Sequence, residues 1–466
     1  MRRVTDDARK RRQRAPRADA SRRGGLGVPA PDGAVDVPVA LLGYGTVGAA
    51  VHRLLEESAD EIERSTGHRL RVTRALVRDL GKERGFSPEP GVLTDDFAAL
   101  RDDSQIAVVA EVMGGVEPAG SYVLELLRGG RPVVTANKQL VARRGPELFE
   151  AAAAGGVQLR FEASVCAAIP VIKVLREALV VTNVHRVLGI VNGTTNFILS
   201  EIESGRSYAE ALAEAQRLGY AEADPTDDVE GLDAAAKMAI LATVAFGSRV
   251  ELDAVRAVGI SAVDGELVRA ARALEMRVKL IGRATLADGG VDVRVGPAFV
   301  DEHHPLASVE GAFNAVMLQG DAIREITLEG PGAGGLETAS AVVADMASVV
   351  GTIGTGFLQN DPVWRSLSTL PPGDLASPHY LRLEVEDRAG VLAHIAQALA
   401  AEGVSVARLV QQPGNGHAIL HVITHEASAG CVEAALTTIR TLPESRGDAI
   451  ALPVVSERGV EELGWA

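Results

Sequence analysis

Residues 218–242 contain the side chains of this chain that are best suited to chemistry. Asp233 and Lys237 lie four residues apart in a helix-forming run, so they are expected on one face, one turn apart. An acidic cluster beside such a pair suits a small zwitterionic substrate and a proton transfer. Taken alone, the pattern is more typical of a solvated acidic loop followed by an ordinary surface ion pair, and the other motifs of the chain reverse this preference. The acidic loop contributes Glu222, Asp224, Asp227 and Asp228.

A second motif, near the start of the chain, predicts a dinucleotide site. The apolar run 37–42 predicts a strand, which leads into GYGTVG and then into a helix-forming segment. In this context Gly43 permits the tight turn, Gly45 lets the backbone approach a pyrophosphate, and Gly48 lets helix and strand pack closely. The N-terminus of the following helix offers free N–H groups to an anion. We therefore expect NAD or NADP to bind here.

The choice between the two cofactors depends on the next predicted strand, residues 70–79. This strand ends in Arg78 and Asp79. An acidic residue at this place meets the ribose hydroxyls of NAD, whereas an arginine accommodates the 2′-phosphate of NADP. Arg74 and Lys82 add positive charge nearby, which favours NADP, although the residue pattern leaves NAD open.

Strands and helices alternate through the first 150 residues, which predicts a parallel doubly wound sheet. Further strands are expected at 105–115 and 131–138, each joined by a helical segment. Ligands of such sheets bind at the carboxyl ends of the strands. Four residues are therefore expected near the reactive end of a cofactor: Gly114, Gly115, Asn137 and Lys138.

The following region, 151–335, mixes helical and strand patterns and reads as a substrate domain. Within it, Cys166 could be a thiol nucleophile or a small buried apolar residue. No histidine or basic residue close in sequence would activate it, so burial is favoured. The glycine-rich stretch 330–335 precedes a helix-forming run, where it can contact a cofactor or simply form a turn.

The C-terminal part begins after a linker, 361–378, which is rich in proline and glycine. Residues 379–453 follow a βαββαβ pattern, in which Asp387 is available to cap the first helix. This pattern predicts a ferredoxin-like unit. A unit of this size is expected to bind a ligand or to mediate dimerisation rather than to catalyse a reaction.

Composition limits the classes of function. The chain of 466 residues is 47% apolar and 23% charged, which is typical of a soluble globular protein, and its net charge of −15 argues against nucleic acid as a partner. The leader, 1–36, is basic and lacks the apolar core of a secretion signal, so it predicts a disordered tail. An overextended start, or a weak contact with nucleic acid or membrane, remains an alternative for it. No stretch is long enough to span a membrane. The two cysteines, Cys166 and Cys431, fit a reducing cytoplasm.

Several motifs together resemble one enzyme family. The order GYGTVG, EVMGG, VTANK, FEASV, NGTTNFIL, LGYAEADPTDDVEGLDAAAK and GPGAGG resembles homoserine dehydrogenase, and DRAGVLAHIAQALAAEGVSVARLVQ resembles an ACT regulatory domain. The resemblance covers about 37–453. It implies NAD(P)H-dependent reduction of L-aspartate 4-semialdehyde to L-homoserine, in the branch that leads to threonine, methionine and isoleucine. It also implies a homo-oligomer and a threonine effector.

The resemblance further implies roles for individual residues. Lys237 would donate the proton and Lys138 would assist it. The substrate would be bound by Glu222, Asp233 and Asp228. Cofactor contacts would come from Gly43, Gly45, Thr46, Val47, Gly48, Arg78, Lys138, Gly219 and Gly334.

The resemblance also implies a monovalent cation, usually Na⁺. Its ligands would be the Glu162 carboxylate and the backbone carbonyls of Val165, Ala167 and Ile169. The family commonly has two glycines where this chain has Ala167 and Ala168. Carbonyl ligation therefore survives if these alanines keep a negative φ, and is in doubt if the loop needs a positive one.

The expected fold class is α/β, with a Rossmann-type dinucleotide-binding domain, a mixed α/β substrate and dimerisation domain, and a ferredoxin-like ACT domain. The expected boundaries are 1–36 for the leader, 37–150 for the dinucleotide domain (completed by 336–360), 151–335 for the substrate domain, 361–378 for the linker and 379–453 for the ACT domain.

Two other functions compete with this interpretation. One is a non-catalytic sensor that binds a dinucleotide and an amino acid, although the presence of both lysines weighs against it. The other is a dehydrogenase that acts phosphorylatively on the same aldehyde, which needs an activated cysteine. For the ACT unit, a threonine-responsive switch through a dimer interface near Gly390 competes with a purely structural lobe.

Overall fold

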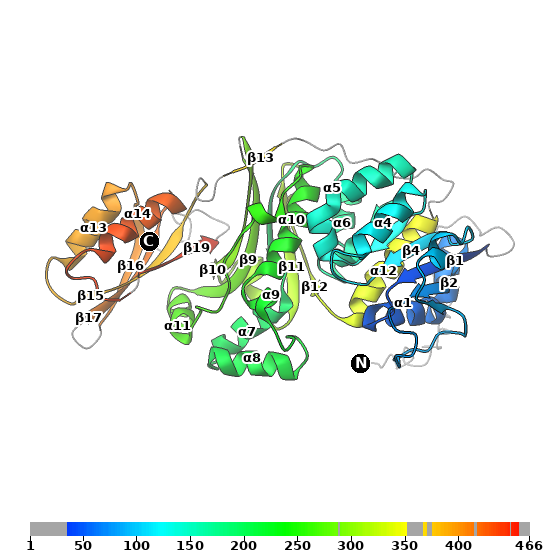
Figure 1. Ribbon diagram of the computed structural model, residues 1–466. Coiled ribbons are helices and arrows are strands. Elements are labelled where there is room, and N and C mark those ends of the chain that lie inside the picture. The colour runs from blue at the N-terminus through cyan, green and yellow to red at the C-terminus, as the bar shows by residue number, and fades with distance from the viewer. Residues whose placement is uncertain are drawn as a thin grey trace, which may run out of the picture.

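The computed structural model describes residues 35–287, 289–351, 367–370, 375–413, 417–447 and 449–455. Almost all of the expected leader lies outside these residues, as do most of the expected linker and the segment 352–360. The described chain forms three units in a row, with the N-terminal unit at one end and the C-terminal unit at the other (Figure 1). No helix within the described ranges is long and apolar enough to cross a membrane.

The N-terminal unit is built on a six-stranded parallel sheet with the order β3-β2-β1-β4-β5-β6. This order places the ends of β1 and β4 side by side, which is where a doubly wound sheet binds its ligand. Its strands are β1 Val35–Leu42, β2 His68–Leu76, β3 Leu93–Thr94, β4 Val108–Glu111, β5 Val133–Thr135 and β6 Leu159–Arg160. Its helices are α1 Thr46–Glu57, α2 Ala59–Thr66, α3 Ala98–Arg101, α4 Ala119–Arg128 and α5 Lys138–Gly155.

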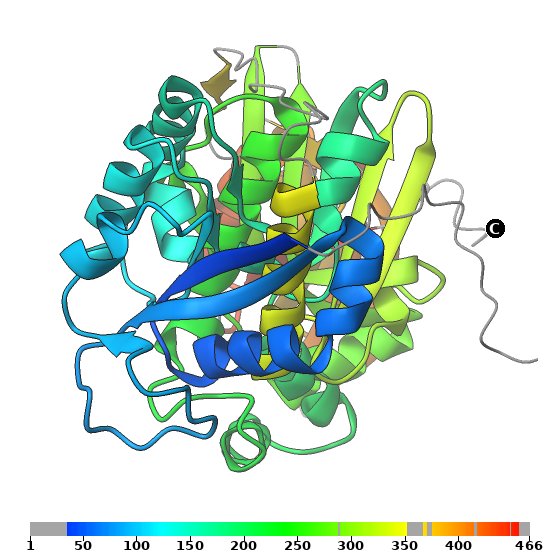
Figure 2. The ribbon, with the colours of Figure 1, turned by 90° about the vertical axis from the view of Figure 1, so that its right-hand side faces the viewer.

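A helix from much later in the chain completes this unit. Helix α12, Gly335–Gly351, runs behind β1 and β2 and packs against α1 (Figure 2). Its buried side chains, among them Val342 and Met346, join Val39 and Val51 in one hydrophobic cluster. The N-termini of α1 and α12 also meet, because Gly335 lies against Thr46.

The central unit combines a sheet with helices on one face. The described chain forms an eleven-stranded sheet in which β12, β11, β7, β9 and β10 are neighbours in that order. These strands are β7 Val184–Ile190, β9 Met276–Ala287, β10 Gly290–Asp301, β11 Phe313–Gly320 and β12 Arg324–Pro331, and the short β8 Arg256–Ala257 and β13 Ser368–Thr369 pair with β10. The helices are α6 Val171–Lys173 with a π-helical turn Val174–Ala178, α7 Gly193–Glu203, α8 Tyr208–Arg217, α9 Thr226–Val229, α10 Leu232–Phe246 and α11 Gly265–Ala273.

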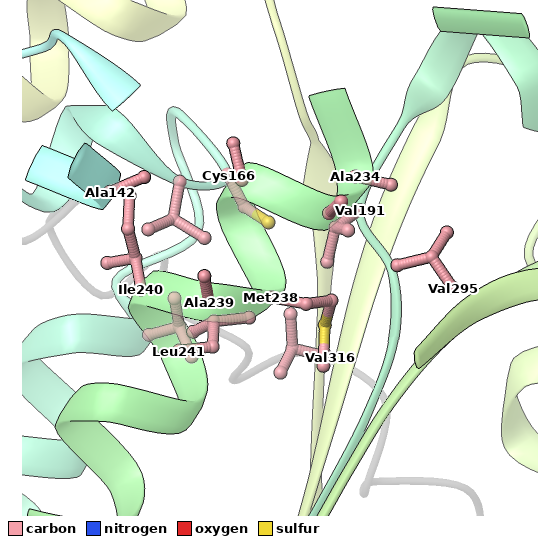
Figure 3. Close-up of a cluster of buried hydrophobic side chains, with 14 of the residues drawn as sticks. Ala142, Cys166, Val191, Ala234, Met238, Ala239, Ile240, Leu241, Val295 and Val316 are labelled. Carbon is pink, nitrogen blue, oxygen red and sulfur yellow. The ribbon is translucent and has the colours of Figure 1, made fainter. Parts of the chain in front are cut away.

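Helix α10 lies at the centre of the molecule because its sequence, LDAAAKMAILATVAF, is apolar on nearly every side. A helix that is apolar all round is buried. Met238, Ile240 and Leu241 pack among residues from α5 and from the sheet (Figure 3). Gly282 on β9 leaves the room that Met238 occupies. This packing fixes the position of the charged residues on the first turns of α10.

The C-terminal unit has the expected ferredoxin-like topology, with the strand order β19-β15-β17-β16. Its strand β19 also pairs in parallel with β10, so the sheets of the central and C-terminal units are continuous. Phe299 of β10 stacks on Tyr380 of β15 across this junction, with ring centroids 4.1 Å apart. The elements are β14 Ala376–Ser377, β15 His379–Glu386, α13 Val391–Ala401, β16 Val406–Pro413, β17 His417–Thr424, β18 Ala427–Ser428, α14 Ala429–Arg440 and β19 Ile450–Val455.

This architecture confirms the predicted fold class. One local prediction was wrong, since Asp387 does not cap α13. The capping residue is Gly390, with φ of 95°, and the turn at 388–390 separates Asp387 from the helix. Asp387 instead accepts a hydrogen bond from Gln411 Nε2 at 3.2 Å.

Candidate active site

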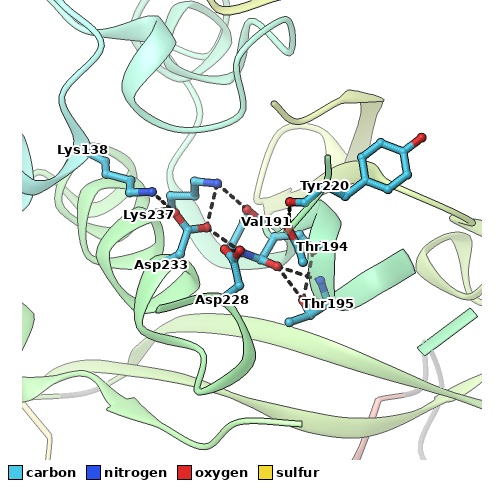
Figure 4. A network of polar contacts seen from close by, with 9 residues as sticks. Lys138, Val191, Thr194, Thr195, Tyr220, Asp228, Asp233 and Lys237 are labelled. Atoms are coloured by element: carbon cyan, nitrogen blue, oxygen red, sulfur yellow. Dashed lines mark hydrogen bonds and ion pairs between the residues drawn. The ribbon is translucent and has the colours of Figure 1, made fainter. Parts of the chain in front are cut away.

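Asp233, on the first turn of α10, is the centre of a polar network (Figure 4). It is almost fully buried, at 2% exposure. Lys237 Nζ lies 2.9 Å from Asp233 Oδ2, and Lys138 Nζ is in contact with the other carboxylate oxygen. Asn192 Nδ2 donates a hydrogen bond to the same carboxylate at 2.9 Å. Two lysines from different units thus converge on one aspartate.

Each member of the network is held by the end of a secondary-structure element. Asn192 caps α7, accepting a hydrogen bond from the Thr195 N–H, and it also donates to Asp228 Oδ1 at 2.7 Å. Lys237 Nζ donates a second hydrogen bond, to the Val191 carbonyl at 2.8 Å, where β7 has just ended. These fixed partners keep the ammonium group of Lys237 in one place.

The charges of this network are mutually stabilising. Burial alone would raise the pKa of Asp233, but the ammonium groups of Lys237 and Lys138 outweigh it and hold that pKa well below its usual range. Burial alone would lower the pKa of Lys237, but Asp233 outweighs it and raises that pKa. The sequence left this balance open. Lys237 is therefore protonated at neutral pH and available as a proton donor.

Lys138 reaches the network from the dinucleotide unit. It is the first residue of α5, just beyond β5, and its side chain is 38% exposed. Asn137 caps this helix by accepting from the Leu140 N–H, and its Nδ2 donates to the Gly115 carbonyl at 2.6 Å. The buried Glu111 at the end of β4 accepts from Thr135 Oγ1 at 2.6 Å. These bonds fix the start of α5 against the end of the parallel sheet.

The remaining predicted substrate residues are Glu222, in the loop between α8 and α9, and Asp228, on α9 itself. Thr194 Oγ1 donates to the Tyr220 carbonyl at 2.7 Å, which ties the loop to α7. Asp228, half-buried, joins the network through Asn192, and burial raises its pKa. Glu222 is exposed, and its backbone carbonyl accepts from Gln216 Nε2, so the structure does not bring its carboxylate into the network.

A large cavity of about 1250 Å³ runs along the carboxyl ends of β1, β2 and β4. It is lined by Gly43, Gly45 and Thr46 from the glycine motif and by Gly335 and Leu336 at the start of α12. Two helix N-termini thus face one cavity, which suits a pyrophosphate. The basic residues Arg53, Arg78, Lys82 and Arg84 line the same cavity.

The glycines of the motif serve different purposes. Gly43 has φ of 102°, and a Cβ on Gly48 would overlap the Gly43 carbonyl oxygen. Gly45, by contrast, has no atom within 4 Å of where a Cβ would be, so that space is open to a ligand. The local geometry therefore fits a bound dinucleotide. Val47 lies within α1, while Gly219 and Gly334, with φ of 79° and 135°, lie in turns after α8 and before α12.

The predicted cation loop is buried beside α12. Glu162 is 4% exposed, and its two carboxylate oxygens accept from the N–H groups of Ile172 and Lys173 at 2.8 Å. Burial, with a contribution from Asp345, raises the pKa of Glu162 to about 7. Among the described residues, no group of three or more His, Cys, Asp and Glu side chains could hold a metal ion. A cation at this loop would therefore depend on backbone carbonyls.

Ala167 does not keep the negative φ on which the cation prediction depended. Its φ is 43°, in the left-handed region. The loop thus keeps a glycine-like backbone even though the residue is alanine, at a cost of roughly 1–2 kcal/mol. The Ile169 carbonyl accepts from the Val171 N–H at 2.8 Å.

Cys166 is fully buried, and burial raises the pKa of its thiol to about 11 despite the nearby Lys237. This agrees with the preferred interpretation of Cys166 as a buried apolar residue. A neutral, enclosed thiol is a poor nucleophile.

Two residues of this region were missed by reasoning from the sequence. Asn192 stands in the NGTTNFIL motif, and an asparagine before a helix was a recognisable capping signal. Its bonds to Asp228 and Asp233 could not be foreseen, because those residues lie 36 and 41 positions later. Asp345, buried on α12, accepts from the Glu162 N–H at 3.0 Å and lies 3.3 Å from Lys173 Nζ.

Three family models match the chain in succession. The model described as the homoserine dehydrogenase NAD binding domain matches residues 43–162, the one described as homoserine dehydrogenase matches 170–347, and the ACT domain model matches 379–444.

Curated relatives and solved structures agree with these matches. The chain is 38% identical to homoserine dehydrogenase of Bacillus subtilis, over 92% of this chain and 99% of that protein, and 43% identical to that of Corynebacterium glutamicum, over 84% and 89%. A crystal structure of homoserine dehydrogenase from Thiobacillus denitrificans superposes with a TM-score of 0.86 at 39% identity, covering 91% of this chain and 99% of that one. A hyperthermophilic archaeal homoserine dehydrogenase in complex with NADPH has a TM-score of 0.58 at 29% identity, covering 68% of this chain and 98% of that chain.

Proposed function

From the premise that this chain belongs to the homoserine dehydrogenase family, we propose that Lys237 protonates the oxygen of L-aspartate 4-semialdehyde as the aldehyde is reduced to L-homoserine. The enzyme is an oxidoreductase that acts on a CH–OH group, and its dinucleotide supplies the hydride when bound. The observation that carries the proposal is the buried Asp233 between Lys237 and Lys138.

Charge explains why two lysines suit this step. Hydride addition to an aldehyde builds negative charge on the oxygen, and a nearby ammonium group stabilises that charge and delivers the proton. Asp233 raises the pKa of Lys237, so the proton is present at neutral pH before the reaction begins. Lys138, at the end of the parallel sheet, is placed to assist from the cofactor side.

Substrate binding is assigned to the acidic residues around this pair. Asp228, which joins the network through Asn192, and the exposed Glu222, which lies outside it, each carry a carboxylate that suits the ammonium group of the substrate. Asp233 has a double role, because it holds both lysines as well as adding negative charge. The function belongs to the synthesis of threonine, methionine and isoleucine.

The direct experiment is oxidation of L-homoserine by the full chain, followed through NADH and NADPH absorbance with Na⁺ or K⁺ present. Turnover is expected with at least one cofactor. Folded protein that binds dinucleotide but turns over with neither cofactor would instead favour the non-catalytic sensor. The phosphorylative alternative is disfavoured by the buried, neutral thiol of Cys166.

NADP is the preferred cofactor in this proposal. Arg78, Lys82 and Arg84 line the cavity near the end of β2, where a 2′-phosphate would lie. The competing Asp79 lines the same cavity and its Oδ1 accepts from the Gly81 N–H at 2.8 Å, so the preference for NADP rests on the greater number of basic residues at this place. In the same assay, kcat/KM is expected to be higher with NADP⁺ than with NAD⁺, and Arg78→Gln should reduce that preference. A preference for NAD⁺ in the unaltered chain would contradict this assignment.

A Na⁺ ion at the loop 162–169 is part of the proposal. The buried Glu162 supplies negative charge, and Val165, Ala167 and Ile169 would supply carbonyl oxygens. The left-handed backbone of Ala167 is the strained element of this loop. Ala167→Gly is expected to raise the free energy of unfolding by about 1 kcal/mol and to lower the Na⁺ concentration that half-saturates activity. Activity that is indifferent to Na⁺ in both proteins would argue against the ion.

Threonine is the proposed feedback ligand of the ACT domain, acting through contacts between copies of the chain near Gly390. Removing residues from 379 onward is expected to leave turnover and abolish threonine inhibition. The archaeal NADPH-bound homoserine dehydrogenase covers only 68% of this chain and 98% of its own length, so a homoserine dehydrogenase can be shorter than this chain. An unchanged inhibition curve in the truncated chain would rule out the ACT domain as the switch.

The same proposal includes a homo-oligomer in a reducing cytoplasm. Among the described residues, strand β12 is an edge of the large sheet, and an edge strand favours pairing with a second copy. Both cysteines are free. Sedimentation equilibrium of the full chain tests the oligomer, and a monomer at micromolar concentration would refute it.

A further inference from the structure

A second cavity lies at the junction between the central sheet and the C-terminal unit. Its volume is about 370 Å³, which suits a small molecule. One wall is formed by β8, β9 and β10, and the other by β19, the start of β15 and the N-terminus of α14. We call it the junction cavity. A ligand bound there would touch both units at once.

The sheet wall of the junction cavity is basic. Arg283 on β9 and Arg294 on β10 lie directly opposite each other in the antiparallel ladder, and both line the cavity. They share the buried carboxylate of Asp292, which lies 2.7 Å from Arg294 Nε and 3.7 Å from Arg283 Nη2. Arg256 adds a third guanidinium group at an exposed position on the wall.

Two buried polar atoms, one on each wall, lack a hydrogen-bond partner among the described residues. Arg294 Nη2 and His379 Nδ1 make no hydrogen bond with any of the described residues. His379 is 94% buried, as its exposure is 6%. A buried polar group without a partner is costly, and native structures rarely retain one unless water or a ligand satisfies it. Both atoms are shielded from solvent, and the two residues that carry them line the cavity.

The opposite wall supplies complementary features. Helix α14 begins at the cavity with Ala429 and Gly430, and its N-terminal dipole favours an anion. One turn later Glu433 also lines the cavity, and its Oε1 accepts from Arg440 Nη1 at 2.7 Å, which leaves Oε2 for a ligand. Apolar side chains, including Val432 and Leu452, complete the lining.

We propose that the junction cavity binds a free α-amino acid. The carboxylate of the ligand pairs with Arg294 and Arg283, its ammonium group faces Glu433, and its side chain contacts the apolar lining. Planar guanidinium groups recognise carboxylates with strong, paired hydrogen bonds. This site is distinct from the Gly390 region. Binding of the amino acid is measured separately from catalysis. Only an effect of that binding on catalysis would rest on the proposed function.

Ligand chemistry is tested first, by titration calorimetry of the full chain with L-threonine, L-isoleucine and L-methionine. At least one of them is expected to bind. For each amino acid that binds, the corresponding amino alcohol, which lacks the carboxylate, is expected to bind at least about tenfold more weakly. The acid without the ammonium group should also lose affinity. If none of the three amino acids binds, or if the amino alcohol binds equally well, the proposal is overturned.

Location is tested with variants of the α14 wall. Gly430→Leu fills the cavity, and its matched control is Gly430→Ala, because a Cβ there approaches Ser428 Oγ no closer than 3.8 Å. Gly430→Leu is expected to raise the Kd at least about tenfold, whereas the alanine variant binds normally. Glu433→Gln, at an exposed position, provides a second test should the leucine variant fold poorly. Arg64→Gln on α2 is the control for loss of a surface charge.

Homoserine oxidation is measured on the same samples without added amino acid. Basal kcat is expected to stay unchanged in every variant, since none of them lies in the catalytic network. An unaltered Kd in both Gly430→Leu and Glu433→Gln would show that the ligand binds elsewhere and would contradict the inference. An active enzyme that binds no amino acid overturns this inference alone, whereas an inactive enzyme that binds one overturns the proposed function and leaves this site intact.

Discussion

At the scale of single residues, the chemistry depends on the contacts that surround Asp233. Its carboxylate holds Lys237, Lys138 and Asn192 together, and each of them comes from a different element. The arrangement keeps a charged lysine protonated in a buried place, where an unpaired ammonium group would lose its proton. In the proposed mechanism, the residues around Lys237 therefore keep the transferable proton on its ammonium group.

Replacing Lys237 by methionine should remove the proton donor and leave the fold intact. Asp233 would still be paired with Lys138 and Asn192, so no buried charge is left alone. We expect kcat to fall by about 10²–10⁴-fold, while the Kd of NADPH, measured by fluorescence, stays within about twofold. Lys237→Arg keeps the charge but cannot readily give up a proton, so it should be nearly as slow. Normal kcat with weakened cofactor binding would contradict the assignment.

Asn192 has two roles: it caps α7, and it positions the carboxylates of Asp228 and Asp233. The substitution Asn192→Asp separates these roles. The aspartate still caps α7, but a third carboxylate then faces Asp228 and Asp233. Repulsion raises carboxylate pKa values, so we expect kcat/KM to fall about tenfold and the acidic limb of its pH profile to move to higher pH. Asn183→Asp is the matched control, because Asn183 also donates to an aspartate, Asp321, on the exposed surface. A pH profile that does not move would show that Asn192 is merely structural.

At the scale of elements, the glycine motif combines a packing requirement with a binding requirement. Gly48 has no room for a Cβ, because the Gly43 carbonyl oxygen occupies that space, whereas the space beside Gly45 is open. The two glycines look alike in the sequence. Their different surroundings arise because β1 and α1 pack together at Gly48, while Gly45 faces the cavity.

This difference predicts that one alanine substitution lowers stability and that the other weakens cofactor binding. Gly48→Ala forces backbone to move and should lower the free energy of unfolding by about 1–3 kcal/mol. Gly45→Ala should leave stability within about 0.5 kcal/mol but weaken NADPH binding, because its methyl group occupies the ligand's space. Urea unfolding and fluorescence titration of both variants check this. Equal destabilisation by the two substitutions would mean that Gly45 is also packed.

At the scale of the whole molecule, the continuous sheet joins the C-terminal unit to the catalytic part. The pairing of β19 with β10 and the stacking of Tyr380 on Phe299 form a mostly apolar junction. His379 lies beside this junction, and burial lowers the pKa of its imidazole to about 4. The junction is therefore sensitive to acid.

The sign of this sensitivity follows from proton binding. Between about pH 6.5 and 4 the unfolded chain protonates His379 but the folded chain does not, so stability falls as the pH falls. The expected slope from this group is up to about 1.4 kcal/mol per pH unit. Comparing urea unfolding at pH 7 and 5, His379→Gln should lose less stability than the unaltered chain. The exposed His303→Gln should behave like the unaltered chain, and identical slopes in all three proteins would refute the role of His379.

Much of this protein was determined by its sequence alone, because the signals concerned are local. The tight turn at Gly43, the four-residue spacing of Asp233 and Lys237 and the βαββαβ pattern of residues 379–453 are each encoded in a continuous stretch of sequence, and the fold class followed from such patterns. The family followed from the resemblance of several motifs to homoserine dehydrogenase. The predicted domain boundaries and site roles stay predictions, although the structure does bring Lys138, Lys237, Asp228 and Asp233 together.

The tertiary structure decided what depends on distant contacts and on burial. Lys138 meets Asp233 across 95 positions of the chain, and Asn192 joins Asp228 to Asp233 in a way that no local pattern encodes. Whether burial or a neighbouring charge controls the pKa of Lys237 is settled only when the surrounding atoms are in place. The left-handed Ala167 and the junction cavity likewise arise from packing between remote segments, because solvent exclusion is a property of the assembled molecule.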